Sequence, residues 1–179
     1  YAPAFAAPVS LAHIGVLLLC FIVQAGSEEI LFRGWMLSAV ARKFNVATGI
    51  AFTTAVFALL HFDRQSPWHD VLLSVLFSLF ACLWALREGS IWGVMGWHAT
   101  WNWLLAVGFE VPITGLDSYT PALLVKLVPQ GSRYLNGGPV GPEGSLLCLA
   151  FFLIASAWLL WRHFSSSGSS SGSPSGQRP

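Results

Sequence analysis

Two adjacent glutamates and an arginine, Glu28, Glu29 and Arg33, interrupt an apolar stretch of this sequence. A charged side chain in the hydrocarbon region of a bilayer is costly, so two acids and a base there indicate a functional site. In a helix, Glu29 and Arg33 lie at positions i and i+4 on one face, where opposite charges stabilise each other. Glu28 is rotated by about 100° from Glu29. We therefore expect a structural Glu29–Arg33 pair and a Glu28 carboxylate that is free for chemistry.

Three more polar side chains lie in apolar segments: His61 at the end of one, and His98 and Asn102 inside another. His98 and Asn102 are four residues apart, so they share a helix face. If successive helices alternate in direction, depth follows from the helical rise of about 1.5 Å per residue. Measured from one membrane face, this depth is about 22 Å for Glu28 and His61, about 20 Å for Asn102 and about 14 Å for His98. We expect these four side chains to share a pocket inside the membrane.

A carboxylate, two imidazoles and a carboxamide in such a pocket are the groups that a water-activating hydrolase needs. Glu28 would be the base that takes a proton from water. One histidine would orient this water, and the other, with Asn102, would donate hydrogen bonds to the oxyanion of a tetrahedral intermediate. The apolar segments contain no H-E-x-x-H motif, no G-x-S-x-G motif and no pair of aspartates. They therefore give no sign of a zincin, a serine hydrolase of the elbow type or an aspartic protease.

The composition is that of a membrane protein. Hydrophobic residues make up 55% of the chain, charged residues only 9%, and the mean hydropathy is +0.64, outside the range of an ordinary soluble domain. A chain of 179 residues is long enough for about six helical segments of roughly 20 residues each. We predict an all-α, polytopic transmembrane bundle, an integral multi-pass protein of the bacterial cell membrane. Its partners would be membrane lipid and a peptide or protein substrate, and the net charge of +1 gives no reason to expect nucleic acid.

Apolar runs separated by charged or proline- and glycine-rich breaks give the predicted helices. Their approximate ranges are 9–26, running on into a second segment that ends at 44, then 46–62, 68–86, 90–108 and 145–161. We expect a polar turn at 63–67 and a long extramembrane loop at 110–144 with one short helix at 122–127. Residues 1–164 would form one domain, and the serine- and glycine-rich residues 165–179 a disordered tail.

Three motifs follow one another on successive apolar segments: Glu28-Glu29-x-x-x-Arg33, Phe57-x-x-x-His61 and His98-x-x-x-Asn102. In this order they resemble the signature motifs of the CAAX protease and bacteriocin-processing (CPBP) family, also called the Abi family. The resemblance covers roughly residues 9–161 and implies an all-helical intramembrane endopeptidase that uses a catalytic glutamate and no cofactor. Eukaryotic members of this family cleave the C-terminal tripeptide from prenylated proteins.

Carried over to this sequence, the resemblance implies that Glu28 is the catalytic glutamate and that His61 helps it to activate water. It implies that His98 and Asn102 form the oxyanion site, and that Glu29 and Arg33 support the site structurally.

Two other interpretations remain open. Glu28, His61 and His98 could bind zinc, because two histidines and one carboxylate are a known catalytic zinc set, and members of the family have been described as metalloproteases. The same side chains could instead form a proton or ion path in a transporter, or a binding site in a non-enzymatic bacteriocin-immunity protein. The lack of an internal sequence repeat speaks against a transporter.

Overall fold

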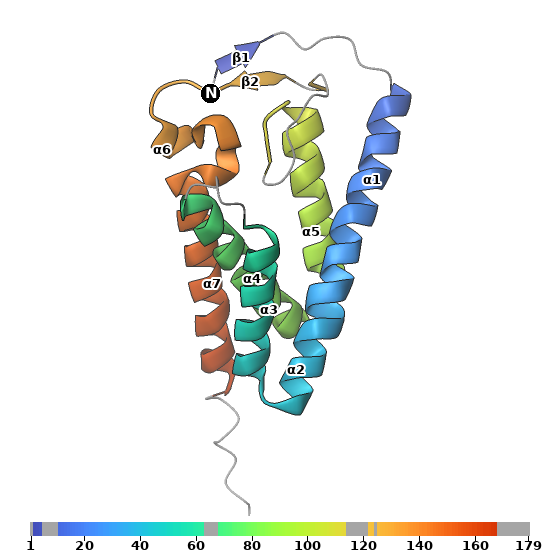
Figure 1. The fold of residues 1–179 in the computed structure, drawn as a ribbon, viewed down its shortest axis with the longest axis vertical. Helices are drawn as coiled ribbons and strands as arrows, with labels where there is room; N and C mark the ends of the chain where they lie inside the picture. Colours follow the sequence, from blue (N-terminus) through green and yellow to red (C-terminus); the bar gives the residue numbers. More distant parts are fainter. Residues whose placement is uncertain (1, 5–10, 63–67, 114–121, 124, 168–179) are drawn as a thin grey trace, which may run out of the picture.

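The computed structural model describes residues 2–4, 11–62, 68–113, 122–123 and 125–167. These residues are mostly helical, and the long helices lie alongside one another in a bundle (Figure 1). The predicted turn at 63–67 lies outside the described residues. Most of the predicted disordered tail does so as well, because the last helix is described as far as Ser167.

The first two predicted segments form one uninterrupted helical run. It consists of α1 (Leu11–Glu29), the π-helix η1 (Ile30–Met36) and α2 (Leu37–Lys43). No proline interrupts its backbone hydrogen bonds, and the charges of Glu29 and Arg33 neutralise each other inside the helix. The described chain therefore has five long helical runs where the sequence predicted six segments.

Four further long helical runs follow. They are α3 (Val46–Leu60), α4 (Trp68–Glu88), α5 (Trp92–Trp103) with its continuation as the π-helix η2 (Leu104–Gly108), and α7 (Leu146–Ser167). Within the described chain, the helical stretches Gly15–Lys43 and Asp70–Glu88 are long and apolar enough to cross a membrane. The apolar helices at 46–60 and 146–162 are shorter.

The helices pack in a simple order, α1 against α5, α2 against α3, α3 against α4, and α4 against α7 (Figure 1). Gly49 allows the close approach of α2 and α3. A Cβ atom at this position would lie only 3.1 Å from the carbonyl oxygen of Leu37 and 3.0 Å from the Cβ of Ala41. A small residue is therefore needed where α3 turns back along α2.

Aromatic rings fill the space between α4, α5 and α7. The ring of Phe152 on α7 makes edge contacts with Phe77 and Trp97 at centroid distances of 5.7 and 5.8 Å. Cys82 and Cys148 are buried free thiols, and Cys148 belongs to the same cluster of buried side chains as Phe152.

A short antiparallel pair of strands stands where a helix was predicted. Residues Lys126–Val128 form β2 and pair with β1 (Ala2–Ala4), which comes from the start of the chain (Figure 1). On its other side, the N–H of Leu127 donates to the carbonyl of Phe109, 3.0 Å away. The predicted helix at 122–127 is therefore wrong, because the backbone groups of this segment bond to distant parts of the chain instead of to one another.

The rest of the connection to α7 is made of short turns: α6 (Arg133–Asn136) and the 3-10 helices η3 (Gly138–Val140) and η4 (Pro142–Gly144). Gly141 has a positive φ of 79°, and a Cβ atom there would lie 2.1 Å from the carbonyl oxygen of Pro112. Only glycine fits this close backbone contact. The contact holds η4 against the chain that follows α5.

Candidate active site

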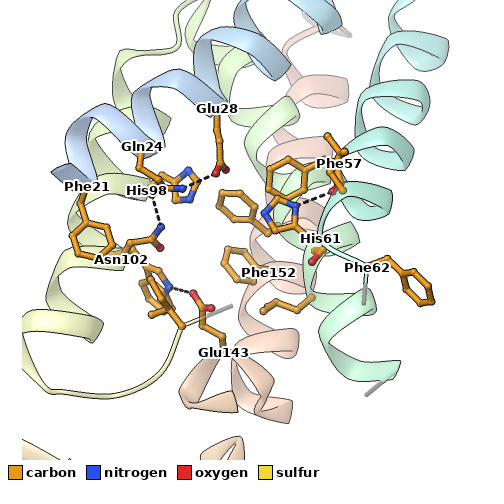
Figure 2. Close-up of a pocket in the computed structure, with 16 residues that line it drawn as sticks. Phe21, Gln24, Glu28, Phe57, His61, Phe62, His98, Asn102, Glu143 and Phe152 are labelled. Carbon is orange, nitrogen blue, oxygen red and sulfur yellow. Dashed lines mark hydrogen bonds between the residues drawn. The ribbon is translucent and has the colours of Figure 1, made fainter. Parts of the chain in front are cut away.

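A cavity of about 500 Å³ lies among α1, α3, α4, α5, α7 and the loop before α7. All four predicted catalytic residues, Glu28, His61, His98 and Asn102, line it. Figure 2 shows Glu28, His98 and Asn102 on one side of the cavity and His61 on the other. Side chains that are far apart in the sequence and come from three helical regions thus face a common space.

Glu28 projects from α1 into the cavity and is half-buried. The Nε2 group of Gln24, one turn earlier on the same helix, donates a hydrogen bond to its Oε1 atom at 2.6 Å. Gln24 also lines the cavity and is a residue that the sequence analysis missed. Its spacing of four residues from Glu28 could have indicated its position, because residues i and i+4 share a helix face.

Glu29 points the other way, into the protein interior, where it is completely buried. Its Oε1 atom lies 3.2 Å from Nη1 of Arg33, so the structure contains the ion pair that the i, i+4 spacing predicted. The same oxygen lies 2.8 Å from Nδ1 of His98 on α5. Since a carboxylate only accepts hydrogen bonds, His98 carries its proton on Nδ1 in this contact, and Nε2 is the ring nitrogen left for the cavity.

Arg33 is only 2% exposed and is surrounded by aromatic rings. The centre of its guanidinium group lies 4.6 Å from the ring centroid of Phe57 and 5.2 Å from that of Phe77. Phe77 in turn contacts the His98 ring edge-on at 4.8 Å. The cation is therefore stabilised by one carboxylate and by the faces of aromatic rings. Arg33 does not line the cavity, but it contacts Phe57 and Phe77, which do.

Two of the three helices that carry the predicted motifs, α1 and α5, change to π-helical hydrogen bonding next to these residues. In the first helix the change follows Glu29, and the N–H of Leu37 bonds to the carbonyl of Phe32, five residues back. In α5 it follows Asn102, and the N–H of Phe109 bonds to the carbonyl of Leu104 at 3.0 Å. Single π-helical turns inside α-helices are common at functional sites. Here each turn shifts the helix face within two residues of a predicted site residue.

His61 is the C-terminal cap of α3. Its Nδ1 atom lies 2.8 Å from the carbonyl oxygen of Phe57, and its ring stacks on the Phe57 ring at a centroid distance of 4.1 Å. A carbonyl oxygen is an acceptor, so Nδ1 carries the proton, and Nε2 of the neutral ring is an acceptor available to water. The motif Phe57-x-x-x-His61 thus sets both the plane of the imidazole and its tautomer.

Asn102 completes the polar side of the cavity. Its Nδ2 group donates to Oε1 of Gln24 at 3.2 Å (Figure 2). Because Gln24 also donates to Glu28, the three side chains form a continuous series of hydrogen bonds.

A second carboxylate, that of Glu143 in η4, reaches the cavity from the loop. Its Oε1 atom accepts a hydrogen bond from Nε1 of Trp101 at 2.7 Å (Figure 2). Glu143 could not be predicted from the sequence, because it lies in an irregular segment where no helical or strand period assigns a face to a side chain.

In the described part of the chain, no three His, Cys, Asp or Glu side chains are grouped closely enough to hold a metal ion. Both imidazoles on the cavity wall use Nδ1 in a hydrogen bond with the protein. These contacts leave Nε2 of each ring for the cavity.

A comparison with protein-family models gives a match over residues 10–104, to the family described as type II CAAX prenyl endopeptidase Rce1-like. The matched range contains all three sequence motifs and Gln24, whereas Glu143 lies beyond it. No solved structure matches significantly.

Proposed function

This chain belongs to the type II CAAX prenyl endopeptidase Rce1-like family, a family of membrane-embedded proteases, and on that premise we propose that it cleaves a peptide bond of a membrane-associated or lipid-modified substrate in the cavity around Glu28. The observation that carries the proposal is that Glu28, His61, His98 and Asn102 line one cavity. Such a set offers a base, a site for water and hydrogen-bond donors for an oxyanion.

In the proposed reaction, Glu28 takes a proton from a water molecule while the water oxygen attacks the carbonyl carbon of the scissile bond. His61 accepts a hydrogen bond from the same water through Nε2 and so directs it. The negative charge develops on the former carbonyl oxygen. When the C–N bond breaks, the proton held by Glu28 passes to the leaving nitrogen, and the products are a carboxylic acid and an amine.

The oxyanion would be stabilised from α5. Asn102 has two N–H groups on Nδ2 and donates one of them to Gln24, so the second remains for the oxyanion. His98 donates through Nε2 when both of its ring nitrogens carry protons, and the Glu29 carboxylate accepts the hydrogen bond from Nδ1 of that form. Glu29 and Arg33 then act by orienting His98.

We also propose that the bundle is multi-pass, with α3, α5–η2 and α7 crossing the membrane beside the two longer candidate spans. Large apolar side chains on these helices face outward, among them Leu59 on α3 and Ile154 on α7, which are 71% and 68% exposed. Such side chains gain from contact with lipid, whereas the polar site residues face inward.

The decisive experiment uses the purified protein in proteoliposomes with a peptide that ends in a prenylated CAAX sequence. Release of the C-terminal tripeptide, followed by mass spectrometry, is expected for the wild type and lost in Glu28→Gln. The substitution keeps the size of the side chain but removes the base, so activity is expected to fall by at least about 100-fold.

Glu88→Gln is the matched control, because Glu88 is exposed at the end of α4 and does not line the cavity. It should leave the rate unchanged. Equal rates for the wild type and a folded Glu28→Gln protein would refute the role of Glu28, and an uncleaved peptide would refute the prenylated CAAX substrate.

A further inference from the structure

Gln24 stands between the two parts of the candidate site. Its side chain is exposed to the cavity on α1. It donates to Glu28 at 2.6 Å through Nε2 and accepts from Asn102 at 3.2 Å through Oε1. The first contact is local, and the second joins residues 78 positions apart in the sequence.

The direction of these hydrogen bonds is set by the carboxylate. An ionised Glu28 can only accept, so Gln24 must turn its NH₂ group toward Glu28 and its carbonyl oxygen toward Asn102. That oxygen can only accept in turn, so Asn102 must present its NH₂ group to Gln24. The charge on Glu28 thereby fixes which end of each amide faces the cavity.

The orientation of the Asn102 amide matters for the proposed chemistry. An Asn102 side chain turned by 180° would present its carbonyl oxygen at Gln24 and could no longer donate from the same position. The oxyanion site would then lose a donor whose placement in the transition state is essential. A neutral side chain without hydrogen-bonding groups at position 24 would leave both amide orientations open.

We propose that Gln24 is a positioning residue that couples the base Glu28 to the oxyanion donor Asn102. The assignment rests on the proposed function for its catalytic consequence, and on the two hydrogen bonds alone for its structural part. Gln24 takes no part in proton transfer; it acts through the side chains on either side of it, Glu28 and Asn102.

The kinetic test compares Gln24→Met with the wild type in proteoliposomes on the prenylated peptide. Methionine matches glutamine in length and shape but neither donates nor accepts as glutamine does. We expect kcat to fall by about 10- to 100-fold, the usual effect of misplaced catalytic groups, with KM changed by less than about twofold.

Val23→Met is the matched control, since Val23 is the neighbouring residue on α1, is 70% exposed and does not line the cavity. If Gln24 only fills space, both methionine variants will keep the wild-type kcat, and the proposal is overturned.

A second test does not depend on protease activity. Side-chain amide signals of the ¹⁵N-labelled protein in nanodiscs report each hydrogen bond separately. The Asn102 signals should shift in Gln24→Met, which removes their acceptor, and the Gln24 signals should shift in Glu28→Gln, which removes a charged acceptor. The amide signals of Asn45, which caps α3, should stay in place in both variants.

Unshifted Asn102 signals in Gln24→Met would overturn the coupling even if the enzyme cleaves the peptide. Shifted signals together with an uncleaved peptide would instead uphold the hydrogen-bonded series and count against the proposed substrate.

Discussion

At the scale of single residues, the two adjacent glutamates have opposite surroundings. Glu28 faces the cavity and is held by a neutral amide, whereas Glu29 is buried and accepts from Arg33 and His98. The difference follows from the rotation of about 100° between neighbours on a helix. Glu29 balances a buried cation and orients an imidazole, whereas Glu28 faces the cavity and is available for the proposed chemistry.

Removing Arg33 should therefore affect folding more than chemistry. Arg33→Ala leaves Glu29 buried without its cation, and breaking a buried ion pair from one side typically costs about 3–5 kcal/mol. We expect a lower yield of folded protein in the membrane and a lower midpoint of thermal unfolding in detergent.

Arg42→Ala is the control for this change, because Arg42 is exposed near the end of α2. A thermal midpoint of Arg33→Ala equal to that of the control would show that Glu29 does not depend on Arg33.

The local part of this arrangement could be predicted from the sequence. The Glu29–Arg33 pair follows from helical spacing alone, and the shared cavity follows from comparing depths along successive helices. The contact between Glu29 and His98 joins residues 69 positions apart, and the one between Trp101 and Glu143 depends on an irregular loop. Neither contact produces a periodic pattern in the sequence, so both could be identified only from the tertiary structure.

At the scale of elements, the segment after η2 is stabilised by contacts across the loop. Glu110 adopts a positive φ of 51°, an unfavourable conformation for a residue with a side chain. Its carboxylate accepts hydrogen bonds from the Ala122 N–H, 3.0 Å away, and from Lys126, the first residue of β2. The predicted helix at 122–127 failed here because these side-chain and strand contacts take its backbone donors.

The ion pair should make this part of the loop sensitive to pH. Partial burial acts to raise the pKa of Glu110, but the hydrogen bonds from Lys126 and Ala122 and the charge of Lys126 outweigh it and lower the pKa below the ordinary value of 4.5. The ionised carboxylate therefore stabilises the folded loop above pH 4.5, and this contribution is lost as the pH falls through the lower pKa of the folded state.

The measurement is the hydrogen-exchange protection factor of the Leu127 N–H, whose acceptor is the carbonyl of Phe109. It should decrease by about two- to fivefold between pH 6 and pH 3, a small change because the pair is partly exposed and screened by solvent. In Glu110→Gln the protection factor should be lower at pH 6 and should no longer depend on this titration. An unchanged pH dependence in that variant would assign the effect to another group.

At the scale of the whole molecule, the polar side chains of the candidate site face the cavity, and large apolar side chains face outward. The ionisable and amide groups of the candidate site line the cavity between the helices, while large apolar side chains such as Val23 and Ile154 lie on the outside. The composition predicted a membrane protein, but it could not fix the number of helices. The continuous helical run from Leu11 to Lys43 shows the reason: an apolar pattern with charges in its middle is compatible with one long helix or with two short ones.

Lysine substitutions along α7 test whether this shorter apolar helix spans the bilayer. Ile154 lies near the middle of α7 and is 68% exposed, whereas Leu146 is its first residue and is 46% exposed. If α7 crosses the membrane, Ile154→Lys places a charge near the bilayer centre at a cost of about 3 kcal/mol. The lysine of Leu146→Lys can instead extend its charge to the interface.

We therefore expect Ile154→Lys to reduce the fraction of protein that resists carbonate extraction from membranes, and Leu146→Lys to leave it near the wild-type level. Ile154→Ala separates the effect of charge from the loss of side-chain volume and should also behave like the wild type. Equal tolerance of lysine at both positions would mean that this face of α7 is in contact with water, and the proposed multi-pass arrangement would then not include α7.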